Sequence, residues 1–180
     1  MSREEIDNQL SILVHIARCI QLKKVFNEID PSPSLNFWRL IHGGFMDLPV
    51  LDWCKIFGAN GEPTHWKGVV DDPAKFRTEL LLKLEISQEE WEQYWNHMKD
   101  YRDELVAHFE AGTDVSTYPD LDIALKSSCF YYNYLYVVIN EGKIEPTQFL
   151  EEYAERFYEQ SKEIANTAYS ATKGMKETVY

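Results

Sequence analysis

Apolar residues recur every three or four positions along most of this chain, and that spacing limits the folds open to it. In residues 4–29, for example, Ile6, Leu10, Leu13 and Ala17 lie on one face of a helix. No stretch alternates apolar and polar residues between hairpin turns, so we predict no strands. The pattern indicates an all-α domain, a helical bundle of five to seven helices.

Local signals set the expected ends of these helices. Asp72 followed by Pro73 is a typical helix start, with the aspartate as capping residue and the proline in the first turn. Ser87, followed by Glu90 three residues later, has the pattern of a capping box. We therefore expect helices over residues 4–29, 34–58, 73–84, 88–111, 121–140 and 146–172.

The second of these helices contains two signals that weaken a helix. Gly43 and Gly44 destabilise it by about 2 kcal/mol relative to alanines. Pro49 lacks a backbone donor and favours a kink. We expect Ser34 to cap this helix, the glycines to mark close packing or a bend, and the helix to be broken into two parts.

The length and charge of the chain limit the class of protein. Its 180 residues, 44% of them hydrophobic, are enough for one domain with its own core. We expect a single domain over residues 1–172 and a frayed tail over residues 173–180. The formal net charge of −12 opposes non-specific binding to nucleic acid or to anionic membranes, and it leaves room for a local basic site.

The cysteines and the N-terminus favour a cytoplasmic protein. Cys19, Cys54 and Cys129 lie far apart, and none belongs to a CxxC pair of the kind that binds zinc or undergoes redox chemistry. We expect them to be buried, reduced thiols. The polar N-terminus is unlike a signal peptide, and no apolar run has the length of a membrane span. We therefore expect a soluble, cytoplasmic protein without a membrane partner.

The main candidate for chemistry is the segment Lys-Asp-Tyr-Arg-Asp-Glu-Leu-Val-Ala-His-Phe at residues 99–109. On an α-helix, Met98 and Tyr101 begin an apolar stripe that continues through this segment. Arg102 and His108 lie on opposite shoulders of the stripe, about 120° apart around the axis. Two such helices in an antiparallel dimer would bring both residues of each chain into one cleft.

Arg102 and Asp103, followed by His108, match the Arg-x(4–6)-His motif of the HEPN superfamily of helical domains, including its polar residue after the arginine. The wider sequence resembles the abortive-infection U-type branch of that superfamily, over most of residues 35–140. The resemblance lies in residues 52–58 (Asp-Trp-Cys-Lys-Ile-Phe-Gly), 65–66 (His-Trp), 103–108, 118–122 (Tyr-Pro-Asp-Leu-Asp) and 130–132 (Phe-Tyr-Tyr).

The resemblance implies a metal-independent endoribonuclease of toxin or anti-phage type that acts as a homodimer and uses no cofactor. Arg102 would stabilise the scissile phosphate, because its planar guanidinium matches phosphate geometry. His108 would orient a group or transfer a proton at the ribose 2′-hydroxyl or the leaving oxygen, because histidine titrates near neutral pH. Asp103 would hold one of them in place. The implied partners are an RNA substrate and a cognate antitoxin or regulatory protein.

Other interpretations of the same segment stay open. Some HEPN domains lack nuclease activity and serve as dimerising modules or bind a protein or small ligand. The acids Asp100, Asp103, Glu104 and Glu110 would repel RNA. Asp100, Glu104 and His108 share a helical face that could bind a divalent cation, or could form ordinary surface ion pairs. The sequence therefore does not decide whether the protein is an enzyme.

Weaker candidates lie elsewhere in the chain. His15 and Cys19 are four residues apart and could share a metal ion, although packing in the core is the simpler interpretation. His42 precedes two glycines and His65 precedes a tryptophan. Either histidine could line a pocket, or could cap a helix or pack in the core.

Overall fold

The computed structural model describes residues 3–59, 61–107, 118–143 and 149–177, and these residues form helices and no strand. The predicted all-α bundle is therefore confirmed. None of the described helices is both long and apolar enough to cross a membrane. The helices are α1 (Arg3–Ile29), α2 (Asn36–Trp53), the π-helical turn η1 (Cys54–Gly58), the 3-10 turn η2 (Trp66–Gly68), α3 (Pro73–Leu84), α4 (Gln88–Tyr101), the π-helical turn η3 (Arg102–Ala107), α5 (Leu121–Ile139) and α6 (Phe149–Thr172).

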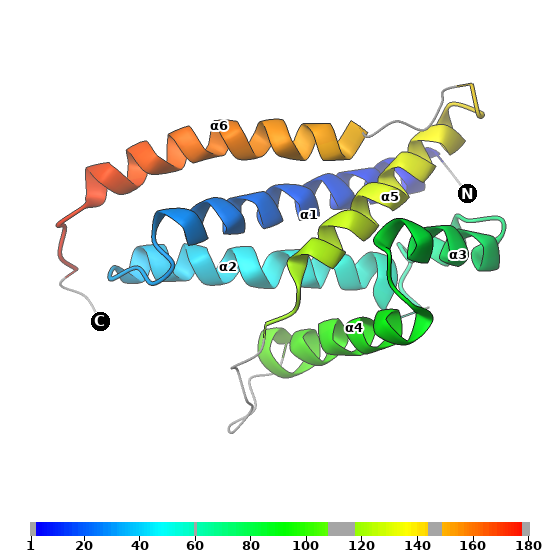
Figure 1. Cartoon of the computed structure of the whole chain (residues 1–180), viewed down its shortest axis with the longest axis horizontal. Helices are drawn as coiled ribbons and strands as arrows, with labels where there is room; N and C mark the ends of the chain where they lie inside the picture. Colours follow the sequence, from blue (N-terminus) through cyan, green and yellow to red (C-terminus); the bar gives the residue numbers. More distant parts are fainter. Residues whose placement is uncertain (1–2, 60, 108–117, 144–148, 178–180) are drawn as a thin grey trace.

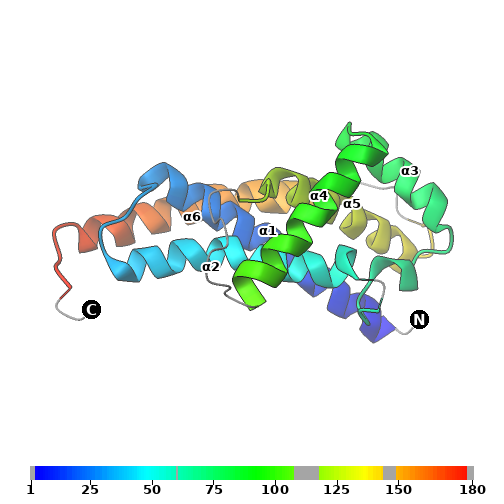
Figure 2. The ribbon, with the colours of Figure 1, turned by 90° about the horizontal axis from the view of Figure 1, so that it is seen from below.

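Helices α1, α2 and α6 run side by side and form the body of the molecule (Figure 1). α1 and α2 make an antiparallel hairpin, and α6 packs along α1 on the side away from α2 (Figure 1). α5 crosses α1 obliquely, while α3 and α4 lie towards the end of the molecule that holds the N-terminus (Figure 1). Seen from below, α4 crosses α2 steeply (Figure 2). The C-terminal end of α4, which carries the candidate motif, thus lies against the C-terminal part of α2.

The main core is centred on the indole ring of Trp53, which is fully buried. The ring centroids of Phe57, Trp91 and Tyr94 lie 5.2, 5.8 and 5.4 Å from it. The indole Nε1 donates a hydrogen bond of 2.9 Å to Ser127 Oγ. This one side chain therefore joins α2, η1, α4 and α5.

Two predicted helix starts are confirmed in detail. The Asp72 carboxylate accepts a hydrogen bond from Lys75 N at the start of α3. Ser87 and Glu90 form the complete capping box that opens α4, with each side chain bonded to the backbone of the other residue. The predicted start of the sixth helix at residue 146 lies outside the described residues, which resume at residue 149.

Helix α2 is continuous, so the predicted break into two parts is wrong. Gly43, Gly44 and Pro49 all lie within it, and Figure 1 shows it running straight. Among the described residues, no heavy atom outside the chain neighbours and the helix's own backbone comes within 4 Å of an ideal Cβ on either glycine, so close packing does not explain them. Val50 and Trp53 beyond the proline are fully buried, and their burial outweighs the helix-weakening residues.

The N-terminus of α2 is capped from a distant part of the chain. The sequence predicts Ser34 as the cap, but the cap position is Leu35, which has no side-chain hydrogen bond. The Glu177 carboxylate instead accepts hydrogen bonds from Asn36 N at 2.6 Å and Phe37 N at 2.8 Å. A carboxylate at this end of a helix also interacts favourably with the helix dipole. Of the predicted frayed tail, residues 178–180 lie outside the described residues.

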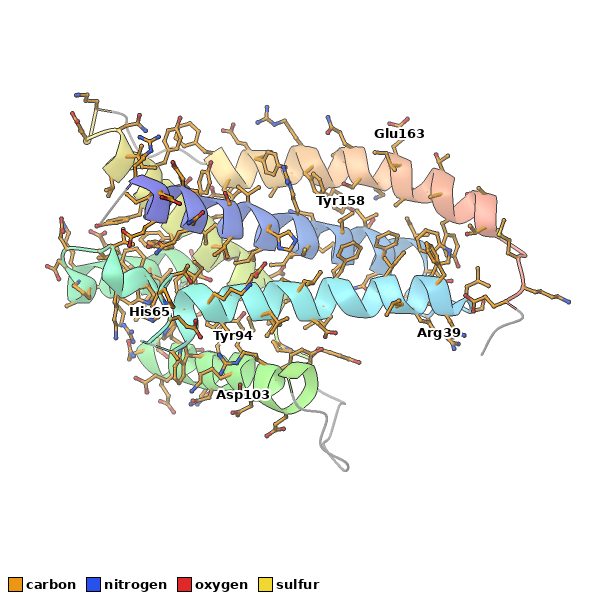
Figure 3. All side chains as sticks on the ribbon, turned by 180° about the vertical axis from the view of Figure 1, so that it is seen from behind. Arg39, His65, Tyr94, Asp103, Tyr158 and Glu163 are labelled. Carbon is orange, nitrogen blue, oxygen red and sulfur yellow. The ribbon has the colours of Figure 1, made fainter. Side chains whose placement is uncertain are left out.

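Replacing Glu177 by alanine should lower the free energy of unfolding by about 1 kcal/mol, because two backbone donors of α2 lose their acceptor. Urea titration followed by circular dichroism measures the change. Glu163→Ala is the matched control, because Glu163 is an exposed glutamate on α6 (Figure 3). Equal stability of the Glu177→Ala variant and the wild type would show that the cap does not contribute.

Candidate functional site

The predicted motif begins where α4 ends. At Arg102 the α-helix gives way to the π-helical turn η3, whereas the sequence predicts an α-helix through residue 111. π-helical turns are rare and occur frequently at functional sites. His108 lies outside the described residues. The predicted separation of about 120° between Arg102 and His108 assumes α-helical geometry. Because Arg102–Ala107 form a π-helical turn, this value does not apply.

Arg102 and Asp103 lie in contact at the start of η3. Arg102 Nε donates a hydrogen bond of 2.7 Å to Asp103 Oδ1, and 20% of the Arg102 side chain is exposed. This hydrogen bond raises the pKa of the Arg102 guanidinium. Asp103 itself is more exposed and lies at the end of α4 (Figure 3). The structure thus brings together two of the three predicted site residues, and their roles in catalysis stay predictions.

The π-helical turn η1 packs against α4 and lies close to Arg102 at the start of η3. Arg102 Nη1 lies 3.6 Å from the position that a Cβ on Gly58 would occupy. Cys54 Sγ lies 3.7 Å from the carbonyl oxygen of Met98. Trp95 Nε1 donates a hydrogen bond of 2.7 Å to the carbonyl oxygen of Phe57. Arg102 is therefore held at a junction between the end of α2 and the end of α4.

A small cavity of about 200 Å³ opens beside this junction. Gly58 lines it, and Arg102 Nη1 lies close to the same glycine. Its walls are mainly aromatic, and the charged residues that line it are Lys67, Arg77 and Glu92. The aromatic lining residues are Phe57, His65, Trp66, Trp91 and Trp95.

His65 is a buried histidine that lines this cavity, where α2, α3 and α4 approach one another (Figure 3). Its Nδ1 accepts a hydrogen bond from Lys67 N, so in the neutral ring the proton is on Nε2. Burial, together with the positive charges of Lys67 and Arg77, lowers the pKa of His65 to about 4. The imidazole is therefore a neutral hydrogen-bond donor at pH 7, close to the positive charges of Lys67 and Arg77.

His15 forms a second constellation on α1 and α2. Its Nδ1 lies 2.5 Å from Asp52 Oδ2, and its Nε2 lies 3.5 Å from Cys19 Sγ. Asp52 is bonded in turn to Lys55 Nζ at 2.6 Å. This order of thiol, imidazole and carboxylate is the one that activates a cysteine nucleophile. The simpler interpretation, that both residues pack in the core, is confirmed for Cys19, which is buried, and is wrong for His15, whose side chain is about half exposed.

The thiols are nevertheless unsuited to nucleophilic chemistry. All three cysteines are buried, as predicted from the sequence. Burial, reinforced by the negative charge of Asp52, raises the pKa of Cys19 to about 11. Burial also raises the pKa of Cys54 to about 11. These thiols stay protonated at neutral pH, and a protonated, buried thiol is a poor nucleophile and a poor metal ligand.

The described residues contain no group of three or more histidine, cysteine or acidic side chains arranged to hold a metal ion. The predicted cation site on Asp100, Glu104 and His108 includes a residue outside the described part of the chain. One of the interpretations left open by the sequence, that His65 lines a pocket, is confirmed, because His65 lines the cavity beside η1. The adjacent His65, Trp66 and Lys67 are a local signal for it, whereas Arg77 lies on another helix and has no such signal.

No family model, curated protein or solved structure matches this chain.

Because the pKa of His65 is lowered in the folded protein, we expect the free energy of unfolding to fall in mild acid. Below the ordinary histidine pKa of 6.5 the unfolded chain binds a proton that the folded protein excludes down to about pH 4. Between pH 7 and pH 5 the wild type should therefore lose about 1–2 kcal/mol of unfolding free energy through this residue. Urea titrations at the two pH values measure the loss.

His65→Asn is the control for this effect, because asparagine keeps an acceptor for Lys67 N and does not titrate. The variant should show a smaller loss of stability between pH 7 and pH 5 than the wild type. An identical loss in both proteins would contradict the assignment of the effect to His65.

Proposed function

We propose that this protein is a HEPN-like endoribonuclease of toxin or anti-phage type that needs no metal ion and acts as a homodimer. Its composite site would contain Arg102 and His108, with Asp103 as a positioning residue. The observation that supports this most is the hydrogen bond from Arg102 Nε to Asp103 Oδ1 at the first residues of η3. A guanidinium that is already held in place loses little rotamer freedom when it binds a phosphate.

The proposed reaction follows from these residue types. The ribose 2′-hydroxyl attacks the neighbouring phosphorus, and the 5′-oxygen of the next nucleotide leaves. Arg102 would stabilise the negative charge that grows on the phosphate oxygens. His108 would take the proton from the hydroxyl or give one to the leaving oxygen. Neither role requires a metal ion.

The local electrostatics are less unfavourable to RNA than the net charge indicates. The Asp103 carboxylate accepts the hydrogen bond from Arg102, so its charge is partly neutralised. Lys99 lies one turn before Arg102 on α4, and its Nζ is 4.2 Å from the centre of the Trp95 ring. Lys99 thus adds one cation near the end of α4, one turn before Arg102.

The same geometry favours a second candidate, a non-catalytic helical module that dimerises or binds a protein or small ligand. The Arg102 side chain is largely buried, is paired with Asp103 and lies over Gly58. An arginine in that position also stabilises the junction between α2 and α4, without any substrate. In this alternative Arg102 is a structural residue.

Incubation with structured and single-stranded RNAs in EDTA tests the nuclease. The wild type should cleave, and His108→Ala should reduce the rate by about a hundredfold or more, because it removes the proton-transferring group. His97→Ala is the matched control, because His97 is a histidine of α4 outside the motif. It should retain activity within about a factor of two. Absence of cleavage by the wild type, or equal cleavage by His108→Ala, would refute the nuclease.

Arg102→Ala separates the two candidate functions. If Arg102 is chiefly structural, this variant should lose about 1 kcal/mol of unfolding free energy and change its oligomeric state. If Arg102 is chiefly catalytic, cleavage should disappear while stability changes little. Urea titration and light scattering after size-exclusion chromatography measure both effects. Arg39→Ala is the control, because Arg39 lies at the opposite end of α2 from this junction (Figure 3).

A further inference from the structure

Three cations gather on tryptophan rings beside the two π-helical turns. Lys67 Nζ and Arg77 Cζ each lie 5.8 Å from the centre of the Trp66 ring. Lys99 Nζ lies 4.2 Å from the centre of the Trp95 ring. In the part of the chain that the structure describes, neither Arg77 nor Lys99 forms an ion pair with a carboxylate.

This arrangement contrasts with the composition of the chain. Acids outnumber bases by 30 to 18, so most cations can find a carboxylate partner. Lys67 of η2 and Arg77 of α3 both line the cavity, and Lys99 of α4 lies on the ring of Trp95, which also lines it. Such a local concentration of cations in an acidic protein favours an anionic ligand.

The cavity between these elements has the size and lining for a small aromatic anion. Its volume of about 200 Å³ is below the 300–1,000 Å³ typical of sites for drug-sized ligands. Trp66 and Trp91 are buried in its walls, while Trp95 is half-buried. Lys67 is exposed and Arg77 is half-buried, so positive charge lies towards the solvent side. Glu92 also lines the cavity, and its carboxylate accepts a hydrogen bond from Gln88.

We propose that this cavity binds one unpaired nucleotide of the RNA, with the base among the indole rings and its phosphate at Lys67 and Arg77. Unpaired bases pack on aromatic side chains in most sequence-tolerant RNA sites, and cations follow the phosphates. That the nucleotide belongs to an RNA chain rests on the proposed function.

Gly58 connects this subsite to the motif. It lines the cavity, and Arg102 Nη1 lies 3.6 Å from the position of its missing Cβ. The backbone of an RNA whose base enters the cavity would therefore pass close to Arg102. The cavity would hold a nucleotide next to the scissile phosphate and so fix the register of cleavage. His65 would add a neutral donor, Nε2–H, to the same subsite.

Binding is measured separately from cleavage by using the His108→Ala protein in EDTA with a short, fluorescein-labelled single-stranded RNA. Fluorescence anisotropy gives the Kd. Arg77→Gln in this background should weaken binding by about tenfold, and Lys67→Gln should weaken it by a similar factor. Arg39→Gln removes the same charge at the far end of α2 (Figure 3) and should change the Kd by less than about twofold. Circular dichroism melts check that each variant is folded.

Competition with small ligands identifies what the cavity recognises. Adenosine or uridine monophosphate should displace the labelled RNA and quench tryptophan fluorescence at lower concentrations than inorganic phosphate does. Equal competition by inorganic phosphate would overturn recognition of a base. Double-stranded RNA should bind more weakly than the single strand, and equal binding would overturn the requirement for an unpaired nucleotide.

The outcomes for the subsite and for the nuclease are distinguishable. Cleavage by the wild type, together with unchanged binding in both Arg77→Gln and Lys67→Gln, would overturn the subsite and support the nuclease. Binding that depends on Arg77 and Lys67, without cleavage by the wild type, would support the subsite and overturn the nuclease. If the wild type does not cleave RNA and binding does not depend on these two cations, both the subsite and the nuclease are overturned.

Discussion

The hydrogen bond from Trp53 to Ser127 is the constraint on which much of this structure depends. A buried indole N–H requires an acceptor, and Ser127 Oγ supplies it at 2.9 Å while donating in turn to the carbonyl oxygen of Ile123. The serine can do this because α5 places it at the centre of the core. The bond therefore sets where α5 lies on α2, and with it the position of the π-helical turn that follows Trp53.

The two π-helical turns connect the core around Trp53 to the candidate site at Arg102. η1 continues α2 directly after Trp53, and its Phe57 carbonyl oxygen accepts the hydrogen bond from Trp95 of α4. α4 then passes into η3, which begins at Arg102. The position of Arg102, the first residue of the motif, is thus set by contacts that extend from the core. A polar site at a helix end is in this way coupled to apolar packing.

The helix ends encoded by adjacent residues were predictable, whereas features that depend on distant residues were not. Asp72 and Ser87 act on backbone groups within three residues of themselves, so their sequence signals are sufficient. The continuity of α2 depends on tertiary burial, which overrides the local signals of Pro49. The Glu177 carboxylate lies at the start of α2, and Arg77 lies beside the cavity that His65 lines, only because tertiary packing brings these distant segments together. For the candidate site, the sequence contains the motif and indicated that His65 could line a pocket, but it did not predict that Arg77 of α3 and Trp95 of α4 line the same pocket.

The hydrogen bonds from α2 to Glu177 can form only late in synthesis of the chain. Glu177 follows Asn36 by 141 residues, so a ribosome adding about 5–20 residues per second needs roughly seven seconds or more to make the interval. During that interval any α1–α2 hairpin on the nascent chain lacks this cap, and the first backbone donors of α2 can bond only to water. Closure by Glu177 comes after all the described helices have been synthesised. The carboxylate therefore stabilises a finished domain and contributes nothing to its nascent hairpin.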